Sequence, residues 1–148
     1  MQPPITLTLD IKNELPEVKR ATDALRDLWV KQKLPEDLEV RVTMCLEEVL
    51  SNVIRHGCEP GLNYDIKVHY TILAGAPGGI EVEVSDNARA FDPLTLPPPD
   101  LTVPLEQRRA GGLGVFLVRR MMDEVRYERR GDRNHFLFRK LWEPEPAD

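Results

Sequence analysis

Residues 45–57 read CLEEVLSNVIRHG, a stretch with apolar residues at helical spacing and two polar residues one turn apart. At about 100° per residue, four apolar residues fall within roughly 60° of Val49, the centre of an apolar stripe: Val42, Cys45, Leu46 and Val53. Glu48 and Asn52 lie one above the other at the margin of this stripe, about 100° and about 60° from its centre. Because burying an unpaired carboxylate or amide is costly, we expect a partner for both: protein groups, water, or a metal with its ligand.

The residues before this stretch predict one strand and two helices. Ile5–Ile11 alternates apolar and polar side chains, as a half-buried strand does. Apolar residues recur at helical spacing over residues 18–33, and Pro35 then interrupts them. Pro35 suits the first turn of the next helix, which we expect to run to Val53 with Gly57 as its C-cap.

The residues after it predict two strands, a glycine-led helix and a closing hairpin. Tyr64–Leu73 and Ile80–Val84 alternate in polarity and are joined by AGAPGG, a hairpin connection. Residues 111–125 read GGLGVFLVRRMMDEV, in which glycines precede an apolar helix. Val125–Arg130 and His135–Trp142 then predict the closing hairpin. This order of elements indicates an α/β protein.

The composition is that of an ordinary soluble globular protein, with 148 residues, 41% of them hydrophobic and 30% charged. This length predicts one domain over residues 1–148. The net charge of −5 argues against nucleic acid and anionic membranes as partners. Because we find neither a membrane span nor a signal-peptide pattern, we expect a cytoplasmic protein. Cys45 and Cys58 are too few for a disulfide framework or a metal cluster.

Residues 92–109 hold five prolines and show no hydrophobic periodicity. A connection of this length without secondary structure is usually a functional lid or a disordered segment. Polyproline geometry would keep it extended. We therefore expect a lid over approximately residues 92–111.

Three short motifs stand in order along the chain. Glu48 and Asn52 form ExxxN, residues 85–93 read SDNARAFDP, and residues 111–114 read GGLG. The phosphate-binding pattern GxxxxGK[ST] does not occur. In these motifs and their order the chain resembles the GHKL superfamily of ATP-binding domains, found in gyrase, heat-shock chaperones, histidine kinases and mismatch-repair MutL. Within it, the chain most resembles the small bacterial anti-sigma-factor serine kinases.

The resemblance implies a Bergerat-type ATP-binding fold, a two-layer α/β sandwich whose mixed, mainly antiparallel sheet carries helices on one face. It implies Asn52 as the Mg²⁺ ligand, Glu48 as the catalytic base, and Asp86 as the acceptor for the adenine amino group. These roles suit the residue types, because Mg²⁺ prefers oxygen ligands and a carboxylate beside buried surface can be tuned for proton transfer. The predicted ATP-binding residues are Asn52, His56, Asp86, Ala88, Phe91, Arg109, Gly111, Gly112, Leu113 and Gly114.

Plainer interpretations of the same residues stay open. Glu48 could be exposed on its helix, and Asn52 could bond to a neighbouring strand. Asp86 could simply begin a turn. The glycines of residues 111–114, which could cradle phosphate at a helix N-terminus, could equally form a hinge. Three further residues also have structural alternatives: His56 as a structural residue, Phe91 in the core, and Arg109 as a solvated charge.

The predicted function is ATP-dependent phosphorylation of a serine on an anti-anti-sigma, STAS-domain partner, coupled to sequestration of a sigma factor. We expect a homodimer, to which exposed apolar residues of Ile5–Leu9 and Tyr64–Leu73 could contribute. The basic residues within 126–140 alternate with aromatic ones, as expected for a hairpin with charges facing outward rather than for direct nucleic-acid binding.

Two other functions compete with this prediction. The family pattern has glycine where this chain has Ala88 and Ala90, which favours a catalytically weak or inactive nucleotide-gated protein-binding module. The second competing function is that of a detached ATP-binding domain of a histidine kinase. It is disfavoured because His56, His69 and His135 do not lie on a dimerising helix that precedes the domain.

Overall fold

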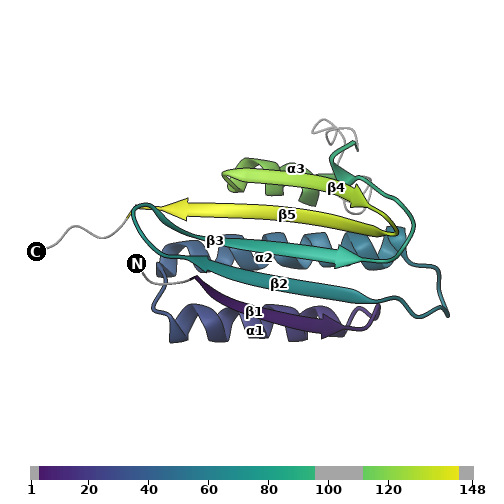
Figure 1. The fold of residues 1–148 in the computed structure, drawn as a ribbon, viewed down its shortest axis with the longest axis horizontal. Helices are drawn as coiled ribbons and strands as arrows, with labels where there is room; N and C mark the ends of the chain where they lie inside the picture. The colour runs from purple at the N-terminus through teal and green to yellow at the C-terminus, as the bar shows by residue number, and fades with distance from the viewer. Residues whose placement is uncertain (1–3, 96–111, 144–148) are drawn as a thin grey trace, which may run out of the picture.

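The fold is built on one five-stranded sheet with the strand order β1-β2-β3-β5-β4 (Figure 1). A computed structural model describes residues 4–95 and 112–143. The strands are β1 (Ile5–Ile11), β2 (Ile66–Leu73), β3 (Gly78–Asp86), β4 (Glu124–Arg130) and β5 (Arg133–Trp142). The mainly antiparallel sheet that we predicted is confirmed. All four pairings within the described residues are antiparallel, so this part of the chain shows no parallel component of a mixed sheet.

Three helices cover one face of the sheet, which confirms the two-layer α/β architecture (Figure 1). They are α1 (Glu17–Lys31), α2 (Glu36–Asn52) and α3 (Gly112–Met121). The Tyr70 hydroxyl of β2 donates a hydrogen bond of 2.6 Å to the carbonyl oxygen of Ala21 in α1. At the other end of α1, the rings of Trp29 and Trp142 meet edge to face with centroids 5.8 Å apart. Apolar burial and these contacts fix the helices on the sheet.

The C-terminal end of α2 departs from the sequence prediction. The helix follows Pro35 as expected, but it continues into a π-helix, η1 (Val53–Gly57), instead of stopping at a glycine cap. The backbone N–H of Cys58 donates to the Val53 carbonyl oxygen at 3.2 Å. Gly57 is therefore the last residue of η1, and it does not adopt the left-handed conformation of a C-cap glycine. Such π-turns inside helices frequently occur at functional sites.

Two glycine predictions also change. Gly78 and Gly79, which we expected in the hairpin connection, begin β3 and lie opposite Trp142 and Leu141 of β5. A Cβ atom at Gly79 would lie 2.8 Å from the Lys140 carbonyl oxygen, so close approach to a neighbouring strand explains that glycine. The helix predicted after GGLG begins at Gly112, so its first turn contains Gly112 and Gly114.

Among the described residues, no helix combines the length and the apolar character needed to span a bilayer.

Candidate functional site

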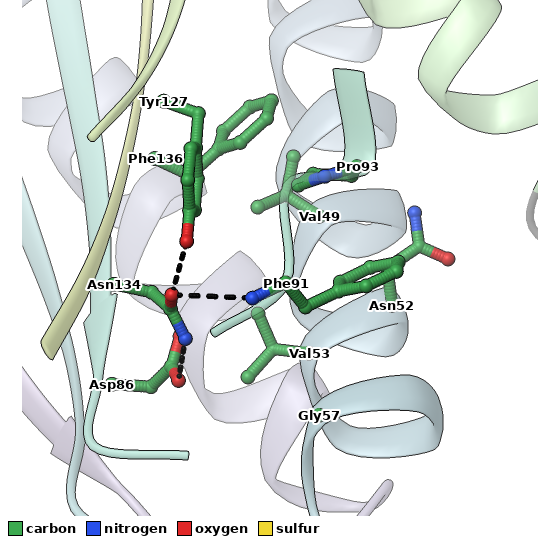
Figure 2. A pocket seen from close by; sticks show the side chains of 10 residues that line it. All are labelled: Val49, Asn52, Val53, Gly57, Asp86, Phe91, Pro93, Tyr127, Asn134 and Phe136. Atoms are coloured by element: carbon green, nitrogen blue, oxygen red, sulfur yellow. Dashed lines mark hydrogen bonds between the residues drawn. The ribbon is translucent and has the colours of Figure 1, made fainter. Parts of the chain in front are cut away.

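Side chains from the ends of several elements meet in one pocket beside the C-terminal end of α2 (Figure 2). About 340 Å³ of space lies between its atoms, part of it open to solvent. Its apolar walls include Val49, Val53, Phe91, Pro93 and Phe136. Its polar lining residues are Asn52, Asp86, Tyr127 and Asn134. The fold thus brings Asn52 and Asp86, 34 positions apart in the sequence, to one cavity.

Asp86 ends β3 and is only 3% exposed. Its Oδ1 accepts hydrogen bonds from the Ala88 backbone N–H at 3.0 Å and from Asn134 Nδ2 at 2.9 Å. The turn that we considered as a plainer role for Asp86 is therefore present. No donor to Oδ2 exists within the described part of the chain. Burial raises the pKa of the Asp86 carboxyl, and these two hydrogen bonds, with Arg133 and Arg129 nearby, oppose the shift.

Asn52 is the last residue of α2 and is also only 3% exposed. Its amide nitrogen is buried and has no hydrogen-bond acceptor among the described residues. The suggested bond to a neighbouring strand is thus absent from this part of the structure. An unsatisfied buried polar group costs about 1–3 kcal/mol. Figure 2 shows the Asn52 amide on one side of the Phe91 ring, with Asp86 and Asn134 on the other.

Glu48 lies one turn before Asn52 and is half-buried, so the alternative of a freely exposed glutamate is wrong. It is not among the residues that line the pocket. Burial raises the pKa of the Glu48 carboxyl, nearby Arg55 opposes this, and Glu47 adds to it. A carboxylate with a raised pKa at the margin of a polar site has the properties of a general base.

Phe91 lies beside His56, which is not among the residues that line the pocket. Phe91 is half-buried and lines the cavity, and its ring centroid is 5.9 Å from that of His56. Arg89 donates two hydrogen bonds, of 2.9 and 2.6 Å, to the His56 carbonyl oxygen at the end of η1. The loop after β3 is therefore attached to the π-helix. In this contact the His56 backbone carbonyl holds the loop, which is a structural role.

Ala88 is buried and is not among the residues lining the pocket. A Cβ atom placed on Gly57 would lie 3.5 Å from the Ala88 methyl, so this methyl faces η1. The Ala88 carbonyl oxygen accepts a hydrogen bond of 2.8 Å from Arg129. The alanine that replaces the family's glycine is thus accommodated by packing against η1.

Sequence reasoning missed Asn134 and gave Tyr127 no role in the site. Asn134 is 5% exposed, and its amide contacts Asp86, Arg89 and Tyr127. A signal was present, because position 134 is in phase with the buried side chains of Phe136 and Phe138. A polar residue in the buried phase of a strand needs a hydrogen-bond partner.

Several predicted residues lie where the structure gives little or no description. The structure does not describe Arg109 or Gly111. Of the expected lid at approximately residues 92–111, it describes only residues 92–95. The structure places Gly112, Leu113 and Gly114 in the first turn of α3 and does not describe their surroundings. Within the described ranges, no three His, Cys, Asp or Glu side chains gather as a metal cluster.

Comparison with known families identifies one match that spans most of the chain. The family described as the histidine kinase-like ATPase domain matches residues 11–140. The serine/threonine-protein kinase BtrW of Bordetella bronchiseptica is 31% identical over 122 residues, which cover 82% of this chain and 80% of BtrW. The serine-protein kinase RsbW of Listeria monocytogenes is 35% identical over 95 residues, covering 62% of this chain and 56% of RsbW.

Two solved structures share the fold. One contains the RsbU and RsbW domains of a Mycobacterium tuberculosis protein, with a TM-score of 0.62 and 17% identity, and the match covers 97% of this chain and 34% of that one. The other is the SiaB–SiaC complex of Pseudomonas aeruginosa, with a TM-score of 0.53 and 17% identity, covering 92% and 89%. The chain thus spans about half of RsbW and a third of the mycobacterial chain.

Proposed function

Since the chain belongs to the histidine kinase-like ATPase family, we propose that it binds Mg-ATP in the pocket beside α2 and transfers a phosphoryl group to a serine of a partner protein. The resemblance inferred from the three motifs is confirmed at the level of this family. The predicted enzyme class, an ATP-dependent serine/threonine-protein kinase, is the class for which BtrW and RsbW are named.

One observation carries the nucleotide-binding part of the proposal: two buried polar side chains, Asp86 and Asn52, line the same cavity. Asp86 Oδ2 has no donor among the described residues, so this carboxylate is placed to accept a hydrogen bond from an exocyclic amino group. An acceptor of this kind favours adenine over guanine, whose corresponding group is a carbonyl.

The residues at the other side of Phe91 fit a magnesium-bound phosphate chain. Mg²⁺ is held by few protein oxygens and by substrate phosphates, and Asn52 supplies one neutral oxygen. The buried Asn52 amide nitrogen lacks an acceptor within the described ranges, and phosphate oxygens are acceptors. When bound, Mg²⁺ offsets the negative charge of the phosphates. The glycines that begin α3 would add backbone N–H donors at a helix N-terminus.

Glu48 is the residue that we assign to proton transfer. It lies one turn from Asn52, and its half-buried carboxylate can accept the proton of an incoming serine hydroxyl. The remaining work of phosphoryl transfer is positioning and charge neutralisation, which the buried walls of the pocket support. We place these functions in one domain with a lid at approximately residues 92–111.

For the partner, we propose an anti-anti-sigma protein with a STAS domain. RsbW is named a serine-protein kinase and BtrW a serine/threonine-protein kinase, and the SiaB neighbour was determined in complex with SiaC. Binding of a sigma factor and formation of a homodimer belong to the same proposal. Exposed apolar side chains on β1, Ile5 at 42% and Leu7 at 38%, support a protein contact along this edge.

A nucleotide-gated binding module without transfer activity is the alternative. Its support is that Ala88 and Ala90 replace family glycines. The burial of Ala88 weakens this support, because its methyl packs against Gly57 of η1 and Ala88 is not itself among the residues that line the cavity.

Two variants and a control separate nucleotide binding from phosphoryl transfer. Calorimetry with Mg-ATP should give binding for wild type and for Glu48→Ala but not for Asn52→Ala. Transfer of labelled phosphate to the co-purified partner should be lost in both variants. Glu47→Ala is the matched control, because Glu47 is an exposed carboxylate on the same helix. Absence of Mg-ATP binding by wild type would refute the proposal, and full transfer by Glu48→Ala would refute its catalytic part.

A further inference from the structure

A chain of hydrogen bonds runs from β4 through β5 to the end of β3. The Tyr127 hydroxyl donates to Asn134 Oδ1 at 2.5 Å, and Asn134 Nδ2 donates to Asp86 Oδ1 at 2.9 Å (Figure 2). The same Nδ2 also donates to the Arg89 carbonyl oxygen at 2.8 Å, and the Phe91 backbone N–H donates to Oδ1 at 3.4 Å. The Asn134 amide therefore has acceptors at its nitrogen and donors at its oxygen.

The contacts with Asp86, Arg89 and Phe91 permit only one orientation of the Asn134 amide. If the amide turned by 180°, its oxygen would face the Asp86 carboxylate and the Arg89 carbonyl oxygen, and its nitrogen would face the Phe91 N–H. The Tyr127 hydroxyl could then accept instead of donate, but each of the other three mismatches would leave a buried polar group unsatisfied. Of the two donors to Oδ1, the Tyr127 hydroxyl is much closer than the Phe91 N–H and forms the stronger hydrogen bond.

We infer that Tyr127 is a positioning residue for base recognition: through Asn134, its hydroxyl holds Asp86 as a hydrogen-bond acceptor toward the nucleotide. The inference rests on the proposed function, because it concerns the same nucleotide pocket. A carboxylate that receives an N–H bond on Oδ1 keeps its charge and offers Oδ2 to an amino group. A protonated carboxyl would instead offer a donor, which pairs with a carbonyl.

The charges around Asp86 agree with this role. Burial raises the pKa of Asp86, and the hydrogen bond from Asn134 is the largest opposing effect, ahead of the Ala88 N–H. Arg133 on β5 and Arg129 on β4 also favour the charged form. Cys58, which follows η1, also faces this carboxyl, and burial with the Asp86 charge raises the pKa of its thiol to about 11.

Base selectivity provides the test. Dissociation constants for Mg-ATP, Mg-GTP and magnesium with inorganic triphosphate should be measured by calorimetry on wild type and on Tyr127→Phe. We expect wild type to prefer ATP over GTP. Loss of one buried hydrogen bond should weaken ATP binding in Tyr127→Phe by about three- to tenfold. GTP and triphosphate binding should change less, so that the ATP-to-GTP ratio falls.

Tyr64→Phe is the matched control, because the Tyr64 hydroxyl accepts a hydrogen bond from the Glu59 N–H and does not contact Asp86. This variant should retain the wild-type ratio. Should Tyr127→Phe fail to fold, Asn134→Asp serves as the second variant. It places an acceptor against Asp86 and should reduce ATP binding more than triphosphate binding.

An unchanged ATP-to-GTP ratio in Tyr127→Phe, while wild type binds Mg-ATP, would overturn this inference alone. Equal losses for all three ligands would also overturn it, because they would indicate a general structural role. If wild type binds none of the nucleotides, both the inference and the proposed function fail.

Discussion

At the scale of single residues, Asp86 combines burial with an incomplete set of partners. It is 3% exposed, and the described residues satisfy only one of its carboxylate oxygens. A charged group held in this way lowers stability in the free protein and becomes useful when a ligand supplies the missing partner.

The first prediction concerns Asp86→Asn. Because burial raises the folded-state pKa of Asp86, the folded protein binds the proton more tightly than the unfolded chain does. This contribution to stability is present at low pH and is lost as pH rises through the folded-state pKa. Asparagine carries no charge, and its oxygen can still accept from Ala88 and Asn134. We expect the free energy of unfolding at neutral pH to rise by about 1 kcal/mol, and Mg-ATP affinity to fall by about tenfold or more.

Urea denaturation at several pH values, with calorimetry for binding, measures both effects. The gain in stability should disappear on acidification, where wild-type Asp86 is itself protonated. Asp132→Asn, at an exposed turn position, should change neither quantity. Lower stability of Asp86→Asn at neutral pH would contradict this account of the carboxylate.

At the scale of secondary structure, the site is formed by the C-terminal ends of α2, η1 and β3. The π-helix η1 follows Asn52 at the end of α2, and Arg89 binds its last turn through the His56 carbonyl oxygen. The chain leaving β3 is thereby held against α2, with Phe91 between them in the pocket (Figure 2). The positions of these ends therefore control the distance between Asn52 on one side of the cavity and Asp86 with Asn134 on the other.

A prediction at this scale tests the close approach of β3 and β5. In Gly79→Ala, the new Cβ would lie 2.8 Å from the Lys140 carbonyl oxygen and 2.7 Å from Leu141 Cδ2. Because a paired backbone cannot move away easily, we expect a loss of about 1–3 kcal/mol in the free energy of unfolding. Urea denaturation followed by circular dichroism measures it.

Gly57→Ala is the matched control for that substitution. Its Cβ would lie 3.5 Å from the Ala88 methyl, which is an ordinary contact distance. Its stability should therefore stay much closer to that of wild type. Equal stabilities for Gly79→Ala and wild type would show that the β3–β5 spacing is adaptable.

At the scale of the whole molecule, helices cover one face of the sheet (Figure 1). Many of the side chains that alternate with the buried ones along β2, β3 and β5 are polar and lie on the other face. On this uncovered face Arg139 forms an ion pair with Glu81, and His135 Nδ1 is hydrogen-bonded to a Glu83 carboxylate oxygen at 2.9 Å. In the hairpin of β4 and β5, Phe136 and Phe138 are buried, as predicted, because they point toward the helices. The pocket lies where the ends of α2 and β3 approach each other, so ligand binding there would link the helical layer to the sheet.

The corresponding prediction is that Mg-ATP stabilises the folded protein as a unit. At a free concentration about 100 times its Kd, a ligand stabilises by about 2.7 kcal/mol, or roughly 5–10 °C in melting temperature for a chain of this size. Thermal denaturation should show this shift with Mg²⁺ and a much smaller one with EDTA. Asn52→Ala should show no difference between the two conditions, whereas an equal shift with EDTA in wild type would exclude the magnesium role.

The residues that were predicted well share a local cause. Ile5–Ile11 and the start of α2 after Pro35 agree with the structure because alternation and proline geometry act over a few neighbouring residues. Asn134 and the strand positions of Gly78 and Gly79 were missed because their environments come from other strands. The π-turn at Val53–Gly57 was missed because helical periodicity does not distinguish it from a regular helical end.

The sequence alone determined the order of elements, the apolar stripe of α2 and the family, because these depend on periodicity and on short motifs. Only the tertiary structure decided that Asn52 and Asp86 share one cavity, that Asn134 and Tyr127 complete it, and that Ala88 packs against η1. The physical reason is that hydrogen bonds and burial depend on distances between residues far apart in the chain, and folding alone sets those distances.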